Sequence, residues 1–331
     1  MTAPRIKVLS INGWCRNGST IIGNLLNEVT GFFHVGELHF LWKNAYGNGS
    51  NTRCGCGLDL IECPIWSSVL AAELPPGADP RVHARDVRRS QWSSLRTRHT
   101  WRVLRDGLGS DARREHAATM ARTYRAIADR THCKVIIDST KIPGEAALLS
   151  NVEGIEPLYL HLVRDPRAVA HSWSAQKDYA YVMPAMRSTA YWVGFNLASQ
   201  ALLKRYPERS LFLRYEDFIR DPAATIRSLI ELCGGDPAEN PVHGRTAQLR
   251  KNHTVTGNPD RFKSGPTEIR DFDGKWQAEL PMREKLTTLA LAWPLLKRYG
   301  YPLRGAAAVP ADHEAAPNRA EGSARGSRPH R

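Results

Sequence analysis

The chain has 331 residues and 42% of them are hydrophobic, which is enough apolar material for the core of one large domain or two moderate ones. No apolar run is long enough to cross a bilayer and no targeting segment precedes the first predicted strand, so we expect a soluble cytoplasmic protein without a transmembrane segment. The formal net charge of +13 favours a polyanionic ligand or an acidic substrate, but without a zinc-finger or RNP-like pattern we expect no nucleic-acid partner.

The first predicted strand, over residues 6–11, leads into a glycine-rich loop at 13–20. The loop has the spacing G-x-x-x-x-G-x-[ST] of a phosphate-binding loop, but Ser19 stands where that pattern carries a lysine. Arg16 keeps a cation within the loop. Apolar residues at helical spacing predict a helix over 19–30, whose positive end would face an anion together with the N–H groups of the loop. The ligand is therefore expected to be phosphate-like, and the missing lysine argues against an ordinary ATP or GTP site.

The next part of the chain predicts a short strand, a helix and then a large helical block. The strand covers 32–35, the helix 37–45, and a loop rich in Gly, Asn and Cys covers 46–64. Residues 67–129 are Arg-rich and mostly helical. We expect this block to be an insertion, at about 67–130, on the ligand side of the sheet, where it would help to shape the substrate site.

The rest of the folded part alternates predicted strands with predicted helices. Strands are expected over 134–137, 157–163 and 211–213, and helices over 166–176, 188–206, 223–232 and 282–299. This alternation predicts an α/β fold, a P-loop-like doubly wound parallel sheet flanked by helices, with ligands at the carboxyl ends of the strands. We expect one domain over 1–304, including a basic loop over 252–275. Beyond Arg304 the sequence lacks periodicity, so a disordered tail is expected over 305–331.

Three of the six cysteines lie close together in the sequence. Cys54, Cys56 and Cys63 could supply three thiolates to a zinc ion. However, the C-x-C spacing is tighter than the usual C-x2-C knuckle, and no fourth ligand stands out. We therefore favour ordinary packing for these cysteines and expect no metal. A disulfide framework is not expected either, since no secretory signal is visible.

Several segments, taken in order, resemble the sulfotransferases that use 3′-phosphoadenosine 5′-phosphosulfate (PAPS). The loop resembles the family's 5′-phosphosulfate loop, which implies donor contacts for Arg16, Asn17, Gly18, Ser19 and Thr20. Residues 160–172 resemble the 3′-phosphate segment, where Arg164 and Ser172 take the places of the binding residues. Residues 213–222 are another stretch typical of the family. Residues 257–262 resemble the late basic loop that closes over the nucleotide, which implies a donor contact for Arg261. The likeness is greatest to the bacterial and carbohydrate-type branch.

The resemblance implies transfer of a sulfuryl group from PAPS to a hydroxyl, or an amine, of a small-molecule, carbohydrate or lipid acceptor. The transferred group carries less charge than a phosphoryl group, so fixed cations and backbone donors can replace a metal. A hydroxyl nucleophile also needs a general base. In the resembling branches a glutamate after the second strand takes the proton, which points to Glu37. His39 is the alternative, because histidine titrates near neutral pH. Lys141 stands where tyrosyl members have a lysine that contacts the sulfuryl group.

Two other functions remain open at this point. Residues 135–138 resemble a Walker-B strand ending in Asp138, as in a P-loop kinase or NTPase that holds magnesium. A non-catalytic nucleotide-binding protein is the other alternative. Metal-independent use of PAPS would exclude the first, and loss of activity in Glu37→Gln would exclude the second.

Overall fold

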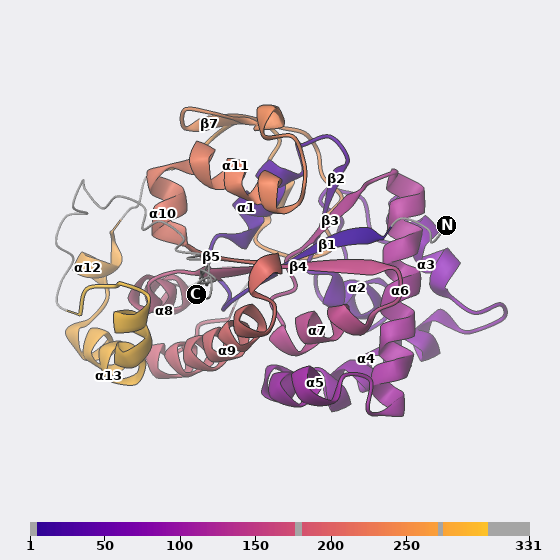
Figure 1. The fold of residues 1–331 in the computed structure, drawn as a ribbon, viewed down its shortest axis with the longest axis horizontal. Coiled ribbons are helices and arrows are strands. Elements are labelled where there is room, and N and C mark those ends of the chain that lie inside the picture. Colours follow the sequence, from indigo (N-terminus) through magenta and orange to yellow (C-terminus); the bar gives the residue numbers. More distant parts are fainter. Residues whose placement is uncertain (1–4, 176–180, 271–273, 304–331) are drawn as a thin grey trace, which may run out of the picture.

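The computed structural model describes residues 5–175, 181–270 and 274–303, so the tail expected over 305–331 lies outside the described residues. Its centre is a five-stranded sheet in the order β2-β3-β1-β4-β5, in which every neighbouring pair is parallel (Figure 1). The strands are β1 (Ile6–Asn12), β2 (Phe32–Gly36), β3 (Val135–Asp138), β4 (Ile155–Val163) and β5 (Ser210–Arg214). This sheet confirms the predicted α/β fold.

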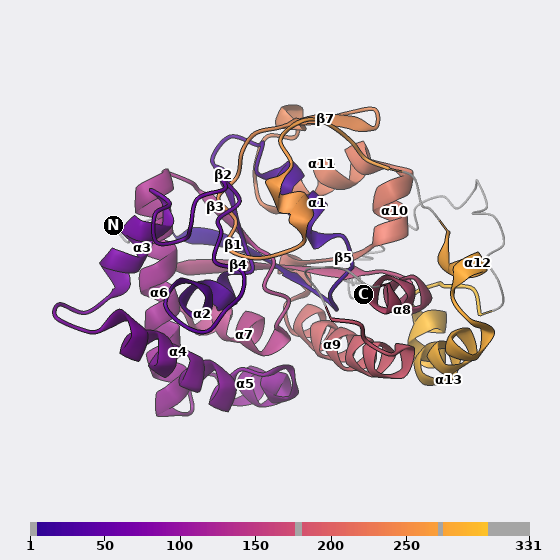
Figure 2. The same cartoon turned by 180° about the vertical axis from the view of Figure 1, so that it is seen from behind.

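Alternate side chains of the strands enter two cores, one on each face of the sheet. Leu9 and Leu160 pack into the core on one face, while Val8 and Tyr159 pack into the core on the other. The first face carries α1 (Ser19–Leu26), α10 (Tyr215–Arg220) and α11 (Pro222–Leu232). The second face carries α2 (Leu41–Ala45), α7 (Pro143–Leu148), α9 (Ala185–Arg205) and the helices of the 67–129 block (Figures 1 and 2). Helices on both faces bury the continuous apolar runs of parallel strands.

Residues 67–129, predicted to be mostly helical, fold into four helices that pack under the sheet. They are α3 (Trp66–Glu73), α4 (Pro80–Ser94), α5 (Thr100–Asp106) and α6 (Asp111–Thr131). The start of α4 is set by Asp79, whose side chain accepts hydrogen bonds from the N–H groups of Arg81 and Val82. Ser110 caps α6 in the same way through the N–H of Arg113. The Gly107 turn separates α5 from this last, long helix.

A smaller core joins the last helices to the sheet at the end that carries β5. Trp14 and Trp192 pack there against residues of α8 (Pro166–Ser174) and α13 (Met282–Arg298). Short α12 (Trp276–Glu279) lies against α8. Within the residues placed by the structure, no helix combines the length and the apolar character needed to cross a membrane.

Three local predictions were wrong. The helix predicted over 19–30 ends at Leu26, because the chain turns tightly before Gly31, which takes φ +77°. The helix predicted over 37–45 opens as a 3-10 turn, Leu38–Phe40, before α2. A second, antiparallel sheet was missed, formed by β6 (Val242–His243), β7 (Thr246–Leu249) and β8 (Gly265–Glu268). Its strands are two to four residues long, too short for an alternating pattern to stand out.

Candidate active site

A cavity of about 340 Å³, here called the loop cavity, lies at the carboxyl ends of the central strands. Most of the predicted site residues line it. They are Arg16, Gly18, Ser19, Thr20, Glu37, Lys141, Arg164 and Ser172. The loop after β1 and the start of α1 form one wall. Ligands of doubly wound sheets bind at this edge, so the position fits the prediction.

The glycine-rich loop is held in shape by strained backbone and by the side chain of Asn17. Arg16 has φ +70°, a left-handed conformation rare for a side chain of its size. Gly18 has φ +94°, and a Cβ there would lie 2.3 Å from the ring of Tyr215, so only glycine fits. Asn17 is buried and donates a hydrogen bond to the carbonyl of Leu162 at 2.9 Å. Its side chain therefore fastens the loop to β4, and its donor contact stays a prediction.

Two arginines bring positive charge to the loop cavity. Arg164, directly after β4, donates from Nη1 to the carbonyl of Arg16 at 3.1 Å, and its guanidinium lies over the ring of Tyr215. Its Nε is buried and has no hydrogen-bond partner among the described residues. The guanidinium of Arg16 lies 4.7 Å from the ring centre of Trp173, on α8. A buried donor without a partner is costly, so Arg164 is a natural anion ligand.

Lys141 brings a third cation to the loop cavity from the end of β3. Its Nζ lies 2.7 Å from Oε1 of Glu37 and 3.4 Å from Oγ of Ser19, and it also donates to the carbonyl of Ser139. Burial acts to lower the pKa of Lys141, but the nearby groups, Glu37 foremost and then Cys15 and Asp138, together raise it. The ammonium group thus reaches the loop residue that replaces the usual lysine. Lys141 also has φ +64°, a strained conformation of the kind found at functional sites.

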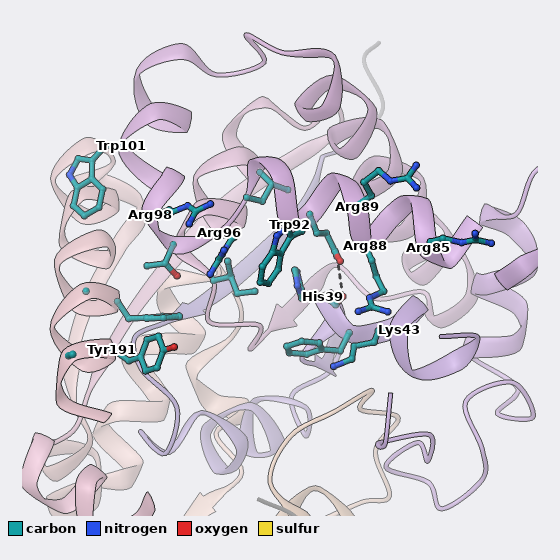
Figure 3. Close-up of a pocket in the computed structure, with 18 residues that line it drawn as sticks. His39, Lys43, Arg85, Arg88, Arg89, Trp92, Arg96, Arg98, Trp101 and Tyr191 are labelled. Atoms are coloured by element: carbon teal, nitrogen blue, oxygen red, sulfur yellow. Dashed lines mark hydrogen bonds between the residues drawn. The ribbon is translucent and has the colours of Figure 1, made fainter. Parts of the chain in front are cut away.

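A larger cavity of about 900 Å³, here called the arginine cavity, opens between α2, α4 and α9. Basic and aromatic side chains dominate its lining, namely Lys43, Arg85, Arg88, Arg89, Arg96, Arg98, Phe40, Trp92, Trp101, Tyr191 and Phe195. In Figure 3, Tyr191 stands across the cavity from Arg88 and Lys43, with Trp92 and His39 between them. Among the described residues that line it, none carries a carboxylate. The cavity therefore favours anionic ligands with an apolar part.

His39 lines the arginine cavity and is held in place by a buried glutamate. Its Nδ1 lies 2.5 Å from Oε2 of Glu145, whose other oxygen lies 3.3 Å from Nε2 of His116. Burial alone would raise the pKa of Glu145, but the two histidines hold it well below its usual range. If Nδ1 of His39 carries the proton shared with Glu145, its Nε2 is left as a proton acceptor.

Lining residues of the two cavities are close together in the sequence. Glu37 and Lys141 line the loop cavity, while their near neighbours His39 and Ile142 line the arginine cavity. The Glu37–Lys141 pair therefore lies near the residues of both cavities. Sequence reasoning did not identify the α4 and α9 residues of the arginine cavity, since surface arginines and tryptophans carry no signal of their own.

Arg261 lines a cavity that shares Gly257 with the loop cavity, and its charge interacts with that of Glu37. It is buried, donates to the carbonyl of Thr254 at 3.2 Å and lies over the ring of Phe262, in the lining of a separate cavity of about 260 Å³. Its donor contact stays a prediction. The neighbouring Gly257 and Asn258 line the loop cavity itself. The late basic segment thus contributes to the wall of the site.

Asp138, the residue of the Walker-B interpretation, is turned into the protein. It accepts hydrogen bonds from the hydroxyl of Tyr124 at 2.8 Å and from the N–H of Thr140 at 2.9 Å. Burial raises its pKa to about 6. The carboxylate is occupied by these partners and is not part of the lining of the loop cavity, so it lends no support to a magnesium-dependent kinase site.

Comparison with known proteins finds similarity to sulfotransferase domains. Residues 146–282 match the family model described as a sulfotransferase domain. The sulfotransferase domain of the Synechococcus PCC 7002 olefin synthase shares the fold with a TM-score of 0.51 and 19% identity, over 92% of this chain and 98% of that one. The sulfotransferase domain from the curacin biosynthetic pathway shares the fold with a TM-score of 0.52 and 18% identity, over 92% of this chain and 100% of that one. No curated protein sequence matches the chain significantly. The matched segment carries Arg164 and Ser172, and the two solved sulfotransferase domains share the fold of this chain.

Proposed function

We propose that this protein is a sulfotransferase that uses PAPS as its donor and transfers the sulfuryl group to a hydroxyl group of an anionic small molecule or glycan. The observation that carries the proposal is a cavity lined by a phosphate-binding-type loop, Glu37 and Lys141, with a second cavity of cations and aromatic rings lined by their sequence neighbours His39 and Ile142. In the reaction, the bond between sulfur and the phosphate oxygen breaks while a bond to the acceptor oxygen forms. The acceptor's proton passes to a base on the protein.

The loop cavity offers separate groups for the two phosphate ends of such a donor. Ser19 and Thr20 begin α1, so their N–H groups and the helix dipole favour the 5′-phosphosulfate, with Arg16 beside them. On the other side, Arg164 and Ser172 suit the 3′-phosphate. The buried Nε of Arg164 supports this assignment, since a phosphate oxygen would supply the partner that this donor lacks among the described residues.

Glu37 and Lys141 are the proposed catalytic pair. Lys141 would stabilise negative charge on the sulfuryl and bridging oxygens, as a fixed cation in a largely water-excluded site. Glu37 would accept the proton from the acceptor hydroxyl. Their 2.7 Å ion pair holds the carboxylate in place before substrates bind. When an anionic donor offers Lys141 a second partner, the carboxylate becomes more available as a base.

His39 is a second candidate for the base, favoured by a specific observation. It lines the arginine cavity, and Glu145 orients it through Nδ1, as in many sites where a carboxylate orients a catalytic histidine. Glu37, in contrast, lines the loop cavity. Replacement of each residue in turn by glutamine distinguishes the two candidates.

The arginine cavity supports an acceptor that combines negative charge with an apolar ring or chain. Trp92 is 67% exposed and Trp101 50% exposed, which is unusual for residues without a partner to cover them. Arg96 already lies over the ring of Trp92, with its guanidinium carbon 4.0 Å from the ring centre. Aromatic rings with adjacent guanidinium groups can bind a planar or apolar group and a carboxylate, phosphate or sulfate together.

The test has a donor arm and an acceptor arm. In the donor arm, calorimetry compares 3′,5′-bisphosphoadenosine with adenosine 5′-phosphate, and we expect the 3′-phosphate to tighten binding at least tenfold. In the acceptor arm, labelled PAPS is offered with matched pairs of anionic and neutral hydroxyl compounds, and products are read by mass spectrometry. Equal affinity for the two nucleotides would overturn the donor assignment. Preference for the neutral member of each pair would overturn the acceptor assignment.

A further inference from the structure

Four potential metal ligands from two distant segments meet beside the β2 strand. Cys54, Cys56 and Cys63 lie in the loop before α3, and His253 lies in the segment after β7. Their ligand atoms all lie within 4.8 Å of one another. The Nδ1 atom of His253 is 3.2 Å from Sγ of Cys63 and 3.7 Å from Sγ of Cys54. The fourth ligand that the sequence did not reveal is thus supplied by the fold.

We propose that these four residues form a structural zinc site. In a tetrahedral zinc site, Zn–S distances are about 2.3 Å and Zn–N distances about 2.0–2.1 Å. A sulfur and a nitrogen ligand then lie about 3.5 Å apart. The two measured separations between sulfur and nitrogen, 3.2 and 3.7 Å, lie on either side of that value. Three thiolates and one imidazole are a common structural zinc set, and four protein ligands leave no position open for catalysis.

The loop geometry explains how the tight C-x-C spacing can work here. Arg53 and Asp59 form an antiparallel bridge, and the N–H of Cys54 donates to the carbonyl of Leu58, so the chain folds back around Cys56. The N–H of Cys56 points to Sγ of Cys54 at 3.5 Å, the kind of backbone contact that stabilises a thiolate ligand. This turn brings the two thiols to one side without the longer spacer of a usual knuckle.

Neighbouring residues hold the cysteine turn and the His253 segment close together. A Cβ on Gly55 would lie 2.0 Å from Oδ1 of Asn252, so the turn can approach the His253 segment only because residue 55 is glycine. The N–H of Gly55 donates to the carbonyl of Thr254 at 2.9 Å. Trp66 donates from its indole to the carbonyl of His253 at 2.6 Å. The histidine is therefore fixed by its neighbours before any metal is considered.

Ordinary packing and a disulfide explain the cluster less well. Ordinary packing of cysteines puts thiols against apolar side chains, whereas here an imidazole nitrogen faces two sulfurs. The cysteines are free thiols in the structure, and a disulfide would use two of them without giving His253 a role. A metal accounts for all four residues at once.

The site has a consequence for the wall of the loop cavity. The segment that carries His253 continues to Gly257 and Asn258, which line that cavity. It is tied to β2 by the N–H of Val255, which donates to the carbonyl of Val35 at 2.9 Å. Zinc would clamp this segment to the cysteine loop. We expect metal loss to loosen the cavity wall and lower the thermal stability of the whole domain, as for other structural zinc sites.

The experiment measures metal in the full chain, expressed without a metal-binding tag in zinc-supplemented medium. Elemental analysis is expected to give one zinc per chain in the wild type and a loss of at least fivefold in Cys63→Ser and in His253→Ala. Cys133→Ala is the matched control, since Cys133 is a buried thiol outside the cluster, and it should keep its zinc. None of these readouts requires a sulfuryl donor, so the zinc site and the proposed donor can fail separately.

A second measurement covers variants that fold poorly. Cobalt added to metal-stripped protein is expected to give the visible bands of a tetrahedral site together with a thiolate-to-cobalt charge-transfer band. In Cys56→Ser the charge-transfer band should weaken by about a third, because one of three thiolates is lost. Cys56 is the most exposed of the three cysteines. The proposal is overturned if wild-type protein contains no zinc and gives no tetrahedral cobalt spectrum. It is equally overturned if mass mapping finds two of the three cysteines joined as a disulfide in protein purified under reducing conditions.

Discussion

Substitution of Glu37 by glutamine separates its proposed chemical role from its structural one. The amide keeps the size of the side chain and an oxygen that can accept from Lys141, but it can no longer take a proton from the acceptor. We therefore expect the turnover rate to fall by about 10²–10⁴, the usual contribution of a general base. Donor affinity should stay the same or rise slightly, because Lys141 is then less strongly held by its partner.

The structure also sets the stability cost of this substitution. The side chains of Lys141 and Glu37 are 5% and 17% exposed and their ion pair is 2.7 Å long, so the pair is largely buried. Removing one partner of a buried pair outright costs about 3–5 kcal/mol. Glutamine retains the hydrogen bond but loses the charge, so we expect a loss of about 1.5–3 kcal/mol in the free energy of unfolding. The pKa of Lys141 should also fall, because burial would then act without the opposing carboxylate.

Three measurements on the same preparation test this reasoning. Turnover is followed at saturating donor and acceptor, donor affinity by calorimetry, and stability by urea unfolding. His39→Gln is the matched control, since it replaces the second candidate base by a similar amide. A wild-type rate in Glu37→Gln combined with a severe loss in His39→Gln would refute the assignment and transfer the role to His39. A loss of stability alone would mean that Glu37 serves only to hold Lys141.

Three further outcomes are expected. Arg164→Ala should weaken binding of a nucleotide with a 3′-phosphate by about 1.5–3 kcal/mol, about 10- to 150-fold. Calorimetry should show no change in the affinity for a nucleotide without the 3′-phosphate. Burial lowers the pKa of His34 to about 3, so the unfolded chain takes up this proton near pH 6.5 and the folded chain does not. The free energy of unfolding should therefore fall by about 1.4 kcal/mol per pH unit between about pH 6 and pH 4. Urea unfolding of His34→Asn over the same pH range should show a smaller fall in this free energy per pH unit. Turnover should be the same with and without added magnesium, and a rate that depends on magnesium would favour the kinase or NTPase interpretation.

The central sheet could be predicted because its strands are continuous apolar runs that end in polar residues. β4 is buried along nearly its whole length and then gives Arg164, which makes both the strand and the site residue visible in the sequence. The short strands of the second sheet have no such contrast with their surroundings. Their pairing depends on contacts between distant segments, such as Leu249 with Gly265, which local periodicity does not encode.

The site was predictable to a lesser extent, because residue type and order do not give side-chain direction. Asn17 has the right position in the loop but is turned inward to β4 by its hydrogen bond to Leu162. Arg261 belongs to the expected segment but lines a second cavity beside the loop cavity. The fourth ligand of the proposed zinc site could not be found from the sequence, since His253 is 190 residues from Cys63 and only folding brings the two together. The catalytic and donor roles of the lining residues stay predictions.

The strand order has a consequence for how this enzyme could change its substrate. Glu37, Lys141, Arg16 and Arg164 each follow a different one of the four adjacent strands β2, β3, β1 and β4, so the sheet itself spaces the charged groups. The arginine cavity owes half of its lining to α4 and the turn after it, outside the sheet. Exchange of that helical module alone could therefore give a new acceptor preference while the residues proposed for sulfuryl transfer stay in place, which makes α4 the natural place to begin redesign.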